Sequence, residues 1–391
     1  MKKYLIIGGG IAGTTAAEEI RKIDKDAEII IIEQESHRLY SRVLLPHYIE
    51  GKVDREKVFL KKLDWYDERN IELFTGVRVE NIDVKNGFVL TSEKRELPFD
   101  KLLLTTGGGL QLIDQDLRGV SYLRSLDDAD HLRELLAEIQ IESNQAKDAI
   151  VLGGGFISLE YINIFAKFKL KTTVVQRSGF WSRVLSQESR EVLVAHLKNH
   201  DIDIVQDSIQ GLVGEKELSG VKLASGKELS AGILGVGIGN KLDQSILMNA
   251  GIMVDGGILA DVFLKTNIEN VYTAGDVAQF QDSLCGRQIQ HGNFMNAIMQ
   301  ARVVAKTMTG KATKFELVSS YGTDVLGMHV VFIGDTSREH ATEVVQVESE
   351  PGSALEIFNR DGKTVGAAII GDVKKRQEIT NAIRDCRKVT F

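Results

Sequence analysis

The sequence of 391 residues is too long for one ordinary hydrophobic core and predicts two or three domains. Hydrophobic residues make up 43% of it and charged residues 26%, which is typical of a soluble globular protein. A net charge of −7 argues against nucleic acid or an anionic membrane surface as a partner. Because Cys285 and Cys386 form no CxxC pair, a disulfide framework is excluded and reduced thiols are expected.

The N-terminus combines Lys2 and Lys3 with apolar residues, as a signal peptide does. Three glycines interrupt the apolar run, and Glu18 and Glu19 follow, so we interpret it as a first β-strand. No uninterrupted apolar run reaches the length that a membrane-spanning helix needs. We therefore expect a cytoplasmic protein that does not cross a membrane.

Residues 4–33 carry the most informative pattern: an apolar strand, a glycine turn, a helix over 11–23 and a second apolar strand. Gly8 permits the sharp turn, Gly10 leaves room for a pyrophosphate group, and Gly13 lets the helix approach the strand. Glu33 stands 20 residues past Gly13, where an acid can accept hydrogen bonds from ribose hydroxyls. The pattern predicts a dinucleotide whose pyrophosphate lies at the helix N-terminus.

The same pattern recurs at residues 149–176, and this internal repeat predicts two dinucleotide-binding folds in one chain. Ser158 replaces the third glycine, which predicts slightly looser packing of the helix on its strand. Gln176 replaces the acid; it can still bind a ribose hydroxyl but would not repel a 2′-phosphate. Arg177 and Arg183 could pair with such a phosphate or simply be solvated, so NADH and NADPH both stay open.

Three further segments resemble the FAD-dependent pyridine nucleotide-disulfide oxidoreductase superfamily, nearest to its nitrite reductase and rubredoxin or ferredoxin reductase branches. Residues 39–51 are similar to its Tyr-x-Arg-x-x-Leu…Gly segment beneath the flavin. Residues 100–108 resemble its second flavin signature, with Thr105 where alanine is usual, and residues 266–276 resemble its last flavin motif, which ends at Asp276. The resemblance covers residues 3–310 well. It implies FAD at the first glycine turn and NADH or NADPH at the second.

The resemblance also implies a set of site residues. For catalysis it points to Glu160 near the nicotinamide–flavin contact, to Arg42, and to His47 near a position where relatives carry a lysine. Taken alone, these could be a solvated acid, a surface ion pair and a packed histidine. No metal site is expected. The implied cofactor-binding residues are Gly8, Gly10, Ala12, Gly13, Glu33, Gln34, Arg42, Val79, Thr106, Gly107, Gly153, Gly155, Ile157, Glu160, Gln176, Arg177, Gly237, Gly275 and Asp276.

We therefore predict an α/β protein with two Rossmann-like dinucleotide-binding domains (the FAD/NAD(P)-binding fold) and a small C-terminal α+β domain. The predicted FAD-binding domain comprises residues 1–112 and 241–316, with an NAD(P)-binding domain at 113–240 and an interface domain at 317–391. Short antiparallel strands are expected over 71–97. A helix is expected over 291–309, with its N-terminus facing the flavin.

The activity that the resemblance implies is FAD-dependent NAD(P)H oxidoreduction. The sequence lacks the redox cysteines of the disulfide reductases and the cysteine quartet for sirohaem or an iron–sulfur cluster, which argues against thiol chemistry and nitrite reduction on this chain. We expect a separate small electron carrier such as rubredoxin or ferredoxin as acceptor. The oligomeric state stays open, a homodimer included. Cations near the C-terminus could bind the carrier or be a solvated helix face: Lys374, Lys375, Arg376, Arg384, Arg387 and Lys388.

Two alternatives remain at this stage. One is an NAD(P)H oxidase that reduces oxygen. The other is a flavoprotein that serves as a binding or sensing module. In that case Ser158, Gln176 and Gly239, which replaces a proline common in the family, mark a degenerate nicotinamide site.

Overall fold

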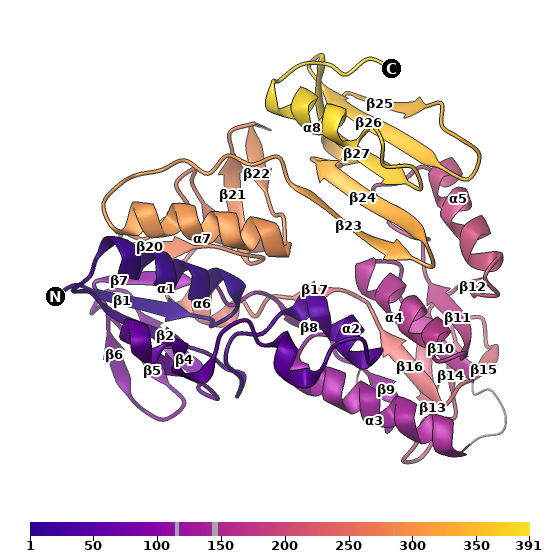
Figure 1. Ribbon diagram of the computed structural model, residues 1–391, viewed down its shortest axis with the longest axis horizontal. Helices are drawn as coiled ribbons and strands as arrows, with labels where there is room; N and C mark the ends of the chain where they lie inside the picture. Colours follow the sequence, from indigo (N-terminus) through magenta and orange to yellow (C-terminus); the bar gives the residue numbers. More distant parts are fainter. Residues whose placement is uncertain (114–116, 143–147, 285) are drawn as a thin grey trace. The chain divides into compact units, whose positions relative to one another are not determined.

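The computed structural model describes residues 1–113, 117–142, 148–284 and 286–391, so Cys285 lies outside the described residues. The chain divides into two compact units (Figure 1). The first comprises residues 1–43, 55–109 and 240–317, and the second comprises residues 44–54, 110–239 and 318–391. The predicted FAD-binding and NAD(P)-binding stretches thus fall largely into different units, and the finer four-part division stays a prediction.

The first unit is built on a five-stranded parallel sheet with the order β20-β7-β1-β2-β3. Its central strands are almost continuously buried runs of Ile and Leu, as in parallel sheets covered on both faces. The prediction of an antiparallel excursion beginning at residue 71 is wrong for β3. This strand pairs parallel to β2, because Ile71 belongs to the same core. The strands are β1 (Lys3–Ile7), β2 (Glu28–Ile32), β3 (Ile71–Phe74), β7 (Lys101–Leu104) and β20 (Val271–Thr273).

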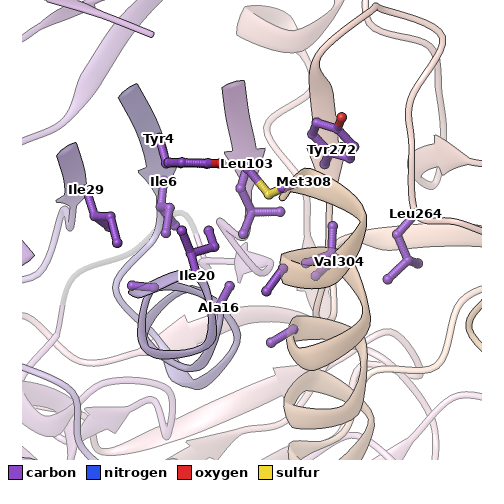
Figure 2. Close-up of a cluster of buried hydrophobic side chains, with 14 of the residues drawn as sticks. Tyr4, Ile6, Ala16, Ile20, Ile29, Leu103, Leu264, Tyr272, Val304 and Met308 are labelled. Atoms are coloured by element: carbon purple, nitrogen blue, oxygen red, sulfur yellow. The ribbon is translucent and has the colours of Figure 1, made fainter. Parts of the chain in front are cut away.

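Helices α1 (Ile11–Ile23) and α7 (Phe294–Met308) pack against each other and against this sheet. Figure 2 shows Ala16 and Ile20 of α1 facing the strand residues Ile6 and Leu103, with Val304 and Met308 of α7 beside them. Helix α1 has its predicted bounds. Helix α7 begins later than predicted, because the Asn293 side chain caps it by accepting the Asn296 N–H.

Smaller elements complete the first unit. The alternating residues up to Leu97 form the expected antiparallel sheet β4-β5-β6, and a four-stranded sheet has the order β18-β19-β21-β22. The strands are β4 (Val79–Asp83), β5 (Phe88–Thr91), β6 (Glu96–Pro98), β18 (Val254–Asp255), β19 (Gly257–Ala260), β21 (Ala278–Asp282) and β22 (Arg287–Ile289). The short helices are η2 (Arg55–Val58), η3 (Leu63–Trp65), η4 (Asp67–Arg69) and α6 (Ser245–Asn249). Where the chain passes between the units lie η1 (Arg42–Leu44), β8 (Gly109–Leu110) and β17 (Asn240–Lys241).

The second unit contains another five-stranded parallel sheet, with the order β12-β11-β10-β16-β9. Helix α3 buries Leu132, Leu135, Leu136 and Ile139, as their helical spacing predicts. The strands are β9 (Val120–Ser121), β10 (Asp148–Leu152), β11 (Lys171–Gln176), β12 (Asp203–Gln206) and β16 (Ile233–Val236), beside an antiparallel sheet of β13 (Ile209–Val213), β14 (Gly220–Leu223) and β15 (Glu228–Ser230). The helices are α2 (Leu45–Ile49), α3 (Leu126–Glu142), α4 (Phe156–Lys167) and α5 (Gln187–Lys198).

A five-stranded antiparallel sheet with the order β23-β24-β27-β26-β25, called the C-terminal sheet below, also belongs to the second unit. Helix α8 packs on β24 and β27, and α5 packs on β26 and β27 (Figure 1). Strand β25 lies in a polar stretch that gave no strand prediction, because it is a partly exposed edge. The elements are β23 (Ser320–Val325), β24 (Met328–Gly334), η5 (Arg338–His340), β25 (Glu343–Val347), β26 (Ala354–Arg360), β27 (Lys363–Ile370) and α8 (Arg376–Arg384).

Within the described ranges, no helix is both long and apolar enough to cross a bilayer.

Candidate functional site

The first glycine turn joins β1 to α1 and requires glycine on steric grounds. Gly8 has φ +105°, and a Cβ there would lie 2.3 Å from the carbonyl oxygen of Thr105. A Cβ on Gly13 would lie only 1.9 Å from the carbonyl oxygen of Gly8. The Thr105 hydroxyl donates to the carbonyl oxygens of Ile7 and Gly8, at 3.0 and 2.9 Å. The turn, the helix and the end of β7 are therefore in direct contact.

The N-terminus of α1 fits the pyrophosphate predicted for it. Helix α1 begins after Gly10, and no side chain caps its first N–H groups. A Cβ on Gly10 would meet no atom within 4 Å, so the turn leaves open space beside the N–H groups. Uncapped N–H groups and the positive end of the helix dipole favour an anion at this position. The residues present therefore fit FAD.

Glu33 lies beside this turn, at the carboxyl end of β2. Its Oε2 accepts the Gly9 N–H at 2.6 Å, and its Oε1 accepts the Glu35 N–H at 2.9 Å. Burial raises the pKa of Glu33, although both N–H groups and the nearby Arg42 guanidinium act against the increase. A carboxylate has lone pairs left for ribose hydroxyls after accepting two hydrogen bonds. Gln34, also predicted, is exposed next to it.

Arg42 belongs to the first unit and lies in an ion-pair cluster whose other members, Glu35 and Tyr40, sequence reasoning missed. Its Nη2 donates to Glu35 Oε1 at 2.6 Å, and the Tyr40 hydroxyl donates to Glu35 Oε2 at 2.5 Å. Burial lowers the pKa of Arg42, but Tyr40 and Glu35 outweigh that effect and the net shift is upward. The signal in the sequence was the acid two positions after Glu33, near the Tyr-x-Arg motif.

The last flavin motif lies next to the start of the helix that follows the first glycine turn. Gly275 follows β20 with φ +84°, and a Cβ on it would lie 3.1 Å from the Cβ of Ala12. The Gly275 N–H donates to Oε1 of the buried Gln300 of α7 at 2.7 Å. Asp276 is the next residue, and its carbonyl oxygen accepts from Gln290. The structure therefore brings the segments of Ala12 and Gly275 together.

Three further predicted residues lie at strand ends of the first unit. Thr106 is exposed and is the second residue after β7, and Gly107 has φ +64°. Val79 begins β4, where its pairing with Thr91 precedes a β-bulge. These positions are compatible with the predicted roles and do not test them.

The second glycine turn repeats the geometry of the first. Gly153 has φ +122°, and a Cβ on it would lie 2.2 Å from the carbonyl oxygen of Gly237. Helix α4 begins after Gly155 without a side-chain cap, and a Cβ on Gly155 would meet no atom within 4 Å. Ile157, in the first turn of α4, is 36% exposed. The open space and uncapped N–H groups fit a second pyrophosphate.

Ser158 is accommodated by a matching change opposite it. Its side chain is fully buried, and its Oγ lies 2.7 Å from the position of a Cβ on Gly237. In the first turn, Thr105 occupies the position equivalent to Gly237, and Gly13 faces Thr105. The hydroxyl thus comes from the strand end in one turn and from the helix in the other. Gly237 leaves the room that Ser158 needs, and the looser packing expected from sequence stays a prediction.

Gln176 lies at the end of β11 beside the second turn, as predicted. It is 5% exposed, and its Oε1 has no hydrogen-bond partner among the described residues. Arg177 and Arg183 are exposed in the loop that follows, and within the described part of the chain no ion pair holds either of them. An unpaired acceptor and exposed guanidinium groups can both bind a nucleotide ribose or its phosphate.

Glu160 lies on α4 in a polar cluster of the second unit. Its Oε1 accepts the hydroxyl of Thr323 from β23 at 2.6 Å. Burial raises the pKa of Glu160, while the Thr323 hydrogen bond and His47 oppose the increase. His47 Nδ1 lies 3.9 Å from Glu50 Oε2, and Glu50 also reinforces the shift. The structure therefore places the predicted Glu160 and His47 in one cluster, and adds Thr323 and Glu50. Sequence reasoning missed both because they are distant along the chain or unremarkable in type.

Comparison with known proteins identifies the family. A family model described as pyridine nucleotide-disulphide oxidoreductase matches residues 2–307. The nitrite reductase [NAD(P)H] of Bacillus subtilis is 29% identical over 98% of this chain and 47% of its own length, and the Rubredoxin-NAD(+) reductase of Ectopseudomonas oleovorans is 25% identical over 97% and 98%. The chain spans about half the length of the nitrite reductase and of a second Bacillus subtilis relative.

Structure comparison supports the same fold. The covalent putidaredoxin reductase–putidaredoxin complex has a chain that matches with a TM-score of 0.89 at 23% identity, over 98% of this chain and 93% of the other. The predicted fold class is confirmed by this match, and FAD and a nicotinamide dinucleotide as cofactors are confirmed by the family. The chain belongs to the pyridine nucleotide-disulphide oxidoreductase family.

Proposed function

We propose that this chain is an FAD-dependent oxidoreductase that takes electrons from NADH or NADPH and passes them through FAD to a separate acceptor. The observation that carries this proposal is the duplicated site. The two parallel sheets share the order of four strands, and in each sheet the central strand ends in a glycine turn with an uncapped helix N-terminus and open space beside it. One chain therefore offers two places for a pyrophosphate, as two-dinucleotide electron transfer requires.

Bound FAD supplies the ability to accept an electron pair and release single electrons. This chain's residues would bind, orient and shield it. Gly10 and the α1 N-terminus would hold the pyrophosphate, Glu33 the ribose, and Asp276 a ribityl hydroxyl. At the second turn, Gly155 and Gln176 would hold the nicotinamide nucleotide. Glu160, whose pKa is raised by burial, would hold or release a proton near the nicotinamide.

The proposed acceptor is a small one-electron carrier of the rubredoxin or ferredoxin type. Relatives named as reductases of such carriers align over nearly their whole length. Cys285 and Cys386 form no CxxC motif, which favours an acceptor outside the chain. A second candidate is oxygen, because an NADH oxidase of Methanocaldococcus jannaschii is also a relative. We further propose a cytoplasmic location, with a homodimer as one possible assembly.

The acceptor can be tested with FAD-loaded protein and either nicotinamide nucleotide. We expect rubredoxin or ferredoxin, followed by its visible absorbance, to be reduced faster than oxygen is consumed. Fast oxygen consumption with no reduction of any carrier would support the oxidase instead.

The C-terminal cations are a candidate carrier site, but acids are interspersed among them. Lys374 lies 3.2 Å from Asp372, and Lys388 lies 2.8 Å from Glu343. Exposed pairs of this kind weaken a positive field without abolishing it. Reversing the charges of Lys375, Arg376 and Arg384 should slow carrier reduction and flatten its salt dependence, with flavin reduction unchanged. Unaltered carrier kinetics would place the docking site elsewhere.

A further inference from the structure

The C-terminal sheet contains one fully buried carboxylate. Glu356 lies in the middle of β26 and is 0% exposed, in a strand whose other residues are mostly apolar. A buried carboxylate is costly unless hydrogen bonds and an opposite charge compensate it. Its Oε2 pairs with the guanidinium of Arg338, and its Oε1 accepts the Ser186 N–H at 2.8 Å.

Both partners of Glu356 lead to the loop 177–186, which follows Gln176 at the second dinucleotide turn. Ser186 is the last residue of this loop and the N-cap of α5. Arg338 Nε donates to the carbonyl oxygen of Val184 at 2.7 Å. The Arg338–Glu356 pair is thus hydrogen-bonded to the loop backbone at two points. Arg338 donates to a carbonyl group, and Glu356 accepts from an N–H group.

Aromatic contacts connect the same sheet to the middle of the loop. The Trp181 ring lies edge-on to Phe332 of β24, with centroids 5.2 Å apart, and 4.9 Å from the ring of Phe156 in the first turn of α4. The backbone N–H of Trp181 donates to the carbonyl oxygen of Gly154, at 3.2 Å. The loop backbone is therefore held against the glycine turn itself.

Helix α5 holds the beginning of the loop. Arg190 Nη1 donates to the Ser178 carbonyl oxygen at 2.9 Å. The side chains of Arg177 and Arg183, in contrast, are exposed. A loop with a fixed backbone and free cationic side chains is preorganised for an anionic or ribose-bearing ligand, because little conformational entropy is lost on binding.

We propose that Arg338 and Glu356 are positioning residues that fix the loop 177–186 and thereby set the affinity and the NADH-versus-NADPH preference of the second site. This inference rests on the proposed function. It assigns to the C-terminal sheet a role in nucleotide selection, exerted through the loop backbone and without contact to the nucleotide.

The test compares Arg338→Met with a matched control, Arg360→Met. Arg360 lies at the end of β26 and pairs with a buried acid, Asp335, at 2.5 Å, and its Nε donates to the carbonyl oxygen of His340. For each FAD-loaded variant, the dissociation constants of NADH and NADPH and the limiting rate of flavin reduction are measured anaerobically, with melting temperature and FAD content as fold controls.

We expect Arg338→Met to weaken nucleotide binding by about three- to tenfold, the effect of a lost charge-assisted restraint, and to change the ratio of the two dissociation constants. The limiting rate and the FAD content should stay close to wild type. Arg360→Met should lower the melting temperature without changing either dissociation constant. Equal effects of the two variants on nucleotide binding would overturn the inference, as would unchanged binding in a folded Arg338→Met.

A milder change covers the case in which Arg338→Met does not fold. Glu356→Gln keeps the acceptor for Ser186 but removes the charge that faces Arg338. We expect faster amide hydrogen exchange at Val184–Ser186 together with weaker nucleotide binding, and unchanged exchange and binding would overturn the inference. If wild-type flavin is reduced by neither nucleotide, the proposed function itself fails, which differs from a reduced wild type with unaffected variants.

Discussion

The two parallel sheets of this chain share one topology but differ in the chemistry at their glycine turns. In both, the turn follows the central strand, β1 or β10, and the helix after it begins uncapped. The fifth strand differs in origin: β20 comes from the far end of its unit's sequence, whereas β9 precedes the other strands of its sheet. The steric frame of the turn is thus kept even when the residues that build it are exchanged.

The two turns also differ in the side chain beside them, which is a carboxylate at the first turn and an amide at the second. Glu33 accepts two backbone N–H groups, so its carboxylate is fixed before any ligand binds. Gln176 is more deeply buried than Glu33, and its Oε1 has no partner among the described residues. A carboxylate held by two backbone hydrogen bonds is preorganised for its ligand, whereas an acceptor without a described partner can gain one from a ligand. This contrast matches resident FAD at the first turn and an exchanging nucleotide at the second.

The largest expected effect is a loss of bound FAD, which should follow a substitution in the first site but not one in the second. Asp276→Ala should lose most of the FAD, with affinity about tenfold to a hundredfold lower, because a buried ribityl hydroxyl would face a methyl group. Asp276→Asn retains an acceptor and should lose less. Gln176→Ala should leave the FAD content unchanged. The flavin absorbance of each purified protein measures this, and full flavin retention by Asp276→Ala would contradict the assignment.

A second prediction concerns the exchange of hydroxyl and glycine. Gly13→Ala should destabilise the protein by about 1–3 kcal/mol, because its Cβ would overlap the Gly8 carbonyl. Ser158→Ala should be nearly neutral, since the buried Oγ has no hydrogen-bond partner within the described ranges. Urea denaturation of the two variants compares them. Adding Thr105→Gly to Gly13→Ser should recover part of the loss, because Thr105 Oγ1 lies 2.8 Å from that Cβ position. Strictly additive effects would argue against the exchange.

A third, smaller effect distinguishes the nucleotides at the second site. Arg177→Glu should weaken NADPH by about tenfold more than NADH, because a carboxylate would face the 2′-phosphate. Dissociation constants from fluorescence titration provide the measurement, with Arg183→Glu as a companion variant. Equal losses for the two nucleotides would show that Arg177 lies outside the 2′-phosphate site.

The smallest predicted effect is a shift in pH dependence. The Thr323 hydroxyl stabilises the ionised form of Glu160 and so opposes the increase in pKa that burial causes. Thr323→Val removes that hydrogen bond, so the pKa of Glu160 should rise further. The acidic limb of the pH profile for flavin reduction should then move to higher pH. Glu160→Gln should remove that limb, and a limb that survives there would belong to another group.

Local patterns were sufficient to predict much of the first unit. The spacing of Gly8, Gly10 and Gly13 and the apolar strands around them place the turn, α1 and Glu33 where the structure has them. Strand β3 was assigned to the wrong sheet, because its short run does not reveal which strand it pairs with. Sheet partners are long-range properties that residue periodicity does not encode.

The parts of the site that sequence could not predict depend on contacts between distant segments. Thr323 reaches Glu160, and Gln300 reaches Gly275, across long separations in the chain. The contact between Ser158 and Gly237 could not be predicted for the same reason, so Ser158 alone suggested a degenerate nicotinamide site. A substitution can be judged only when the residue facing it is known.

Anaerobic titration of the FAD-loaded protein with NADH and with NADPH tests the central claim most directly. If the first turn holds FAD and the second holds a working nicotinamide nucleotide, the flavin absorbance near its visible maximum should bleach at close to one equivalent of the preferred nucleotide. In Arg177→Glu, the bleaching should need a larger excess of NADPH than of NADH. A flavin that stays oxidised with an excess of both nucleotides would contradict the account and favour a flavoprotein with a degenerate second site.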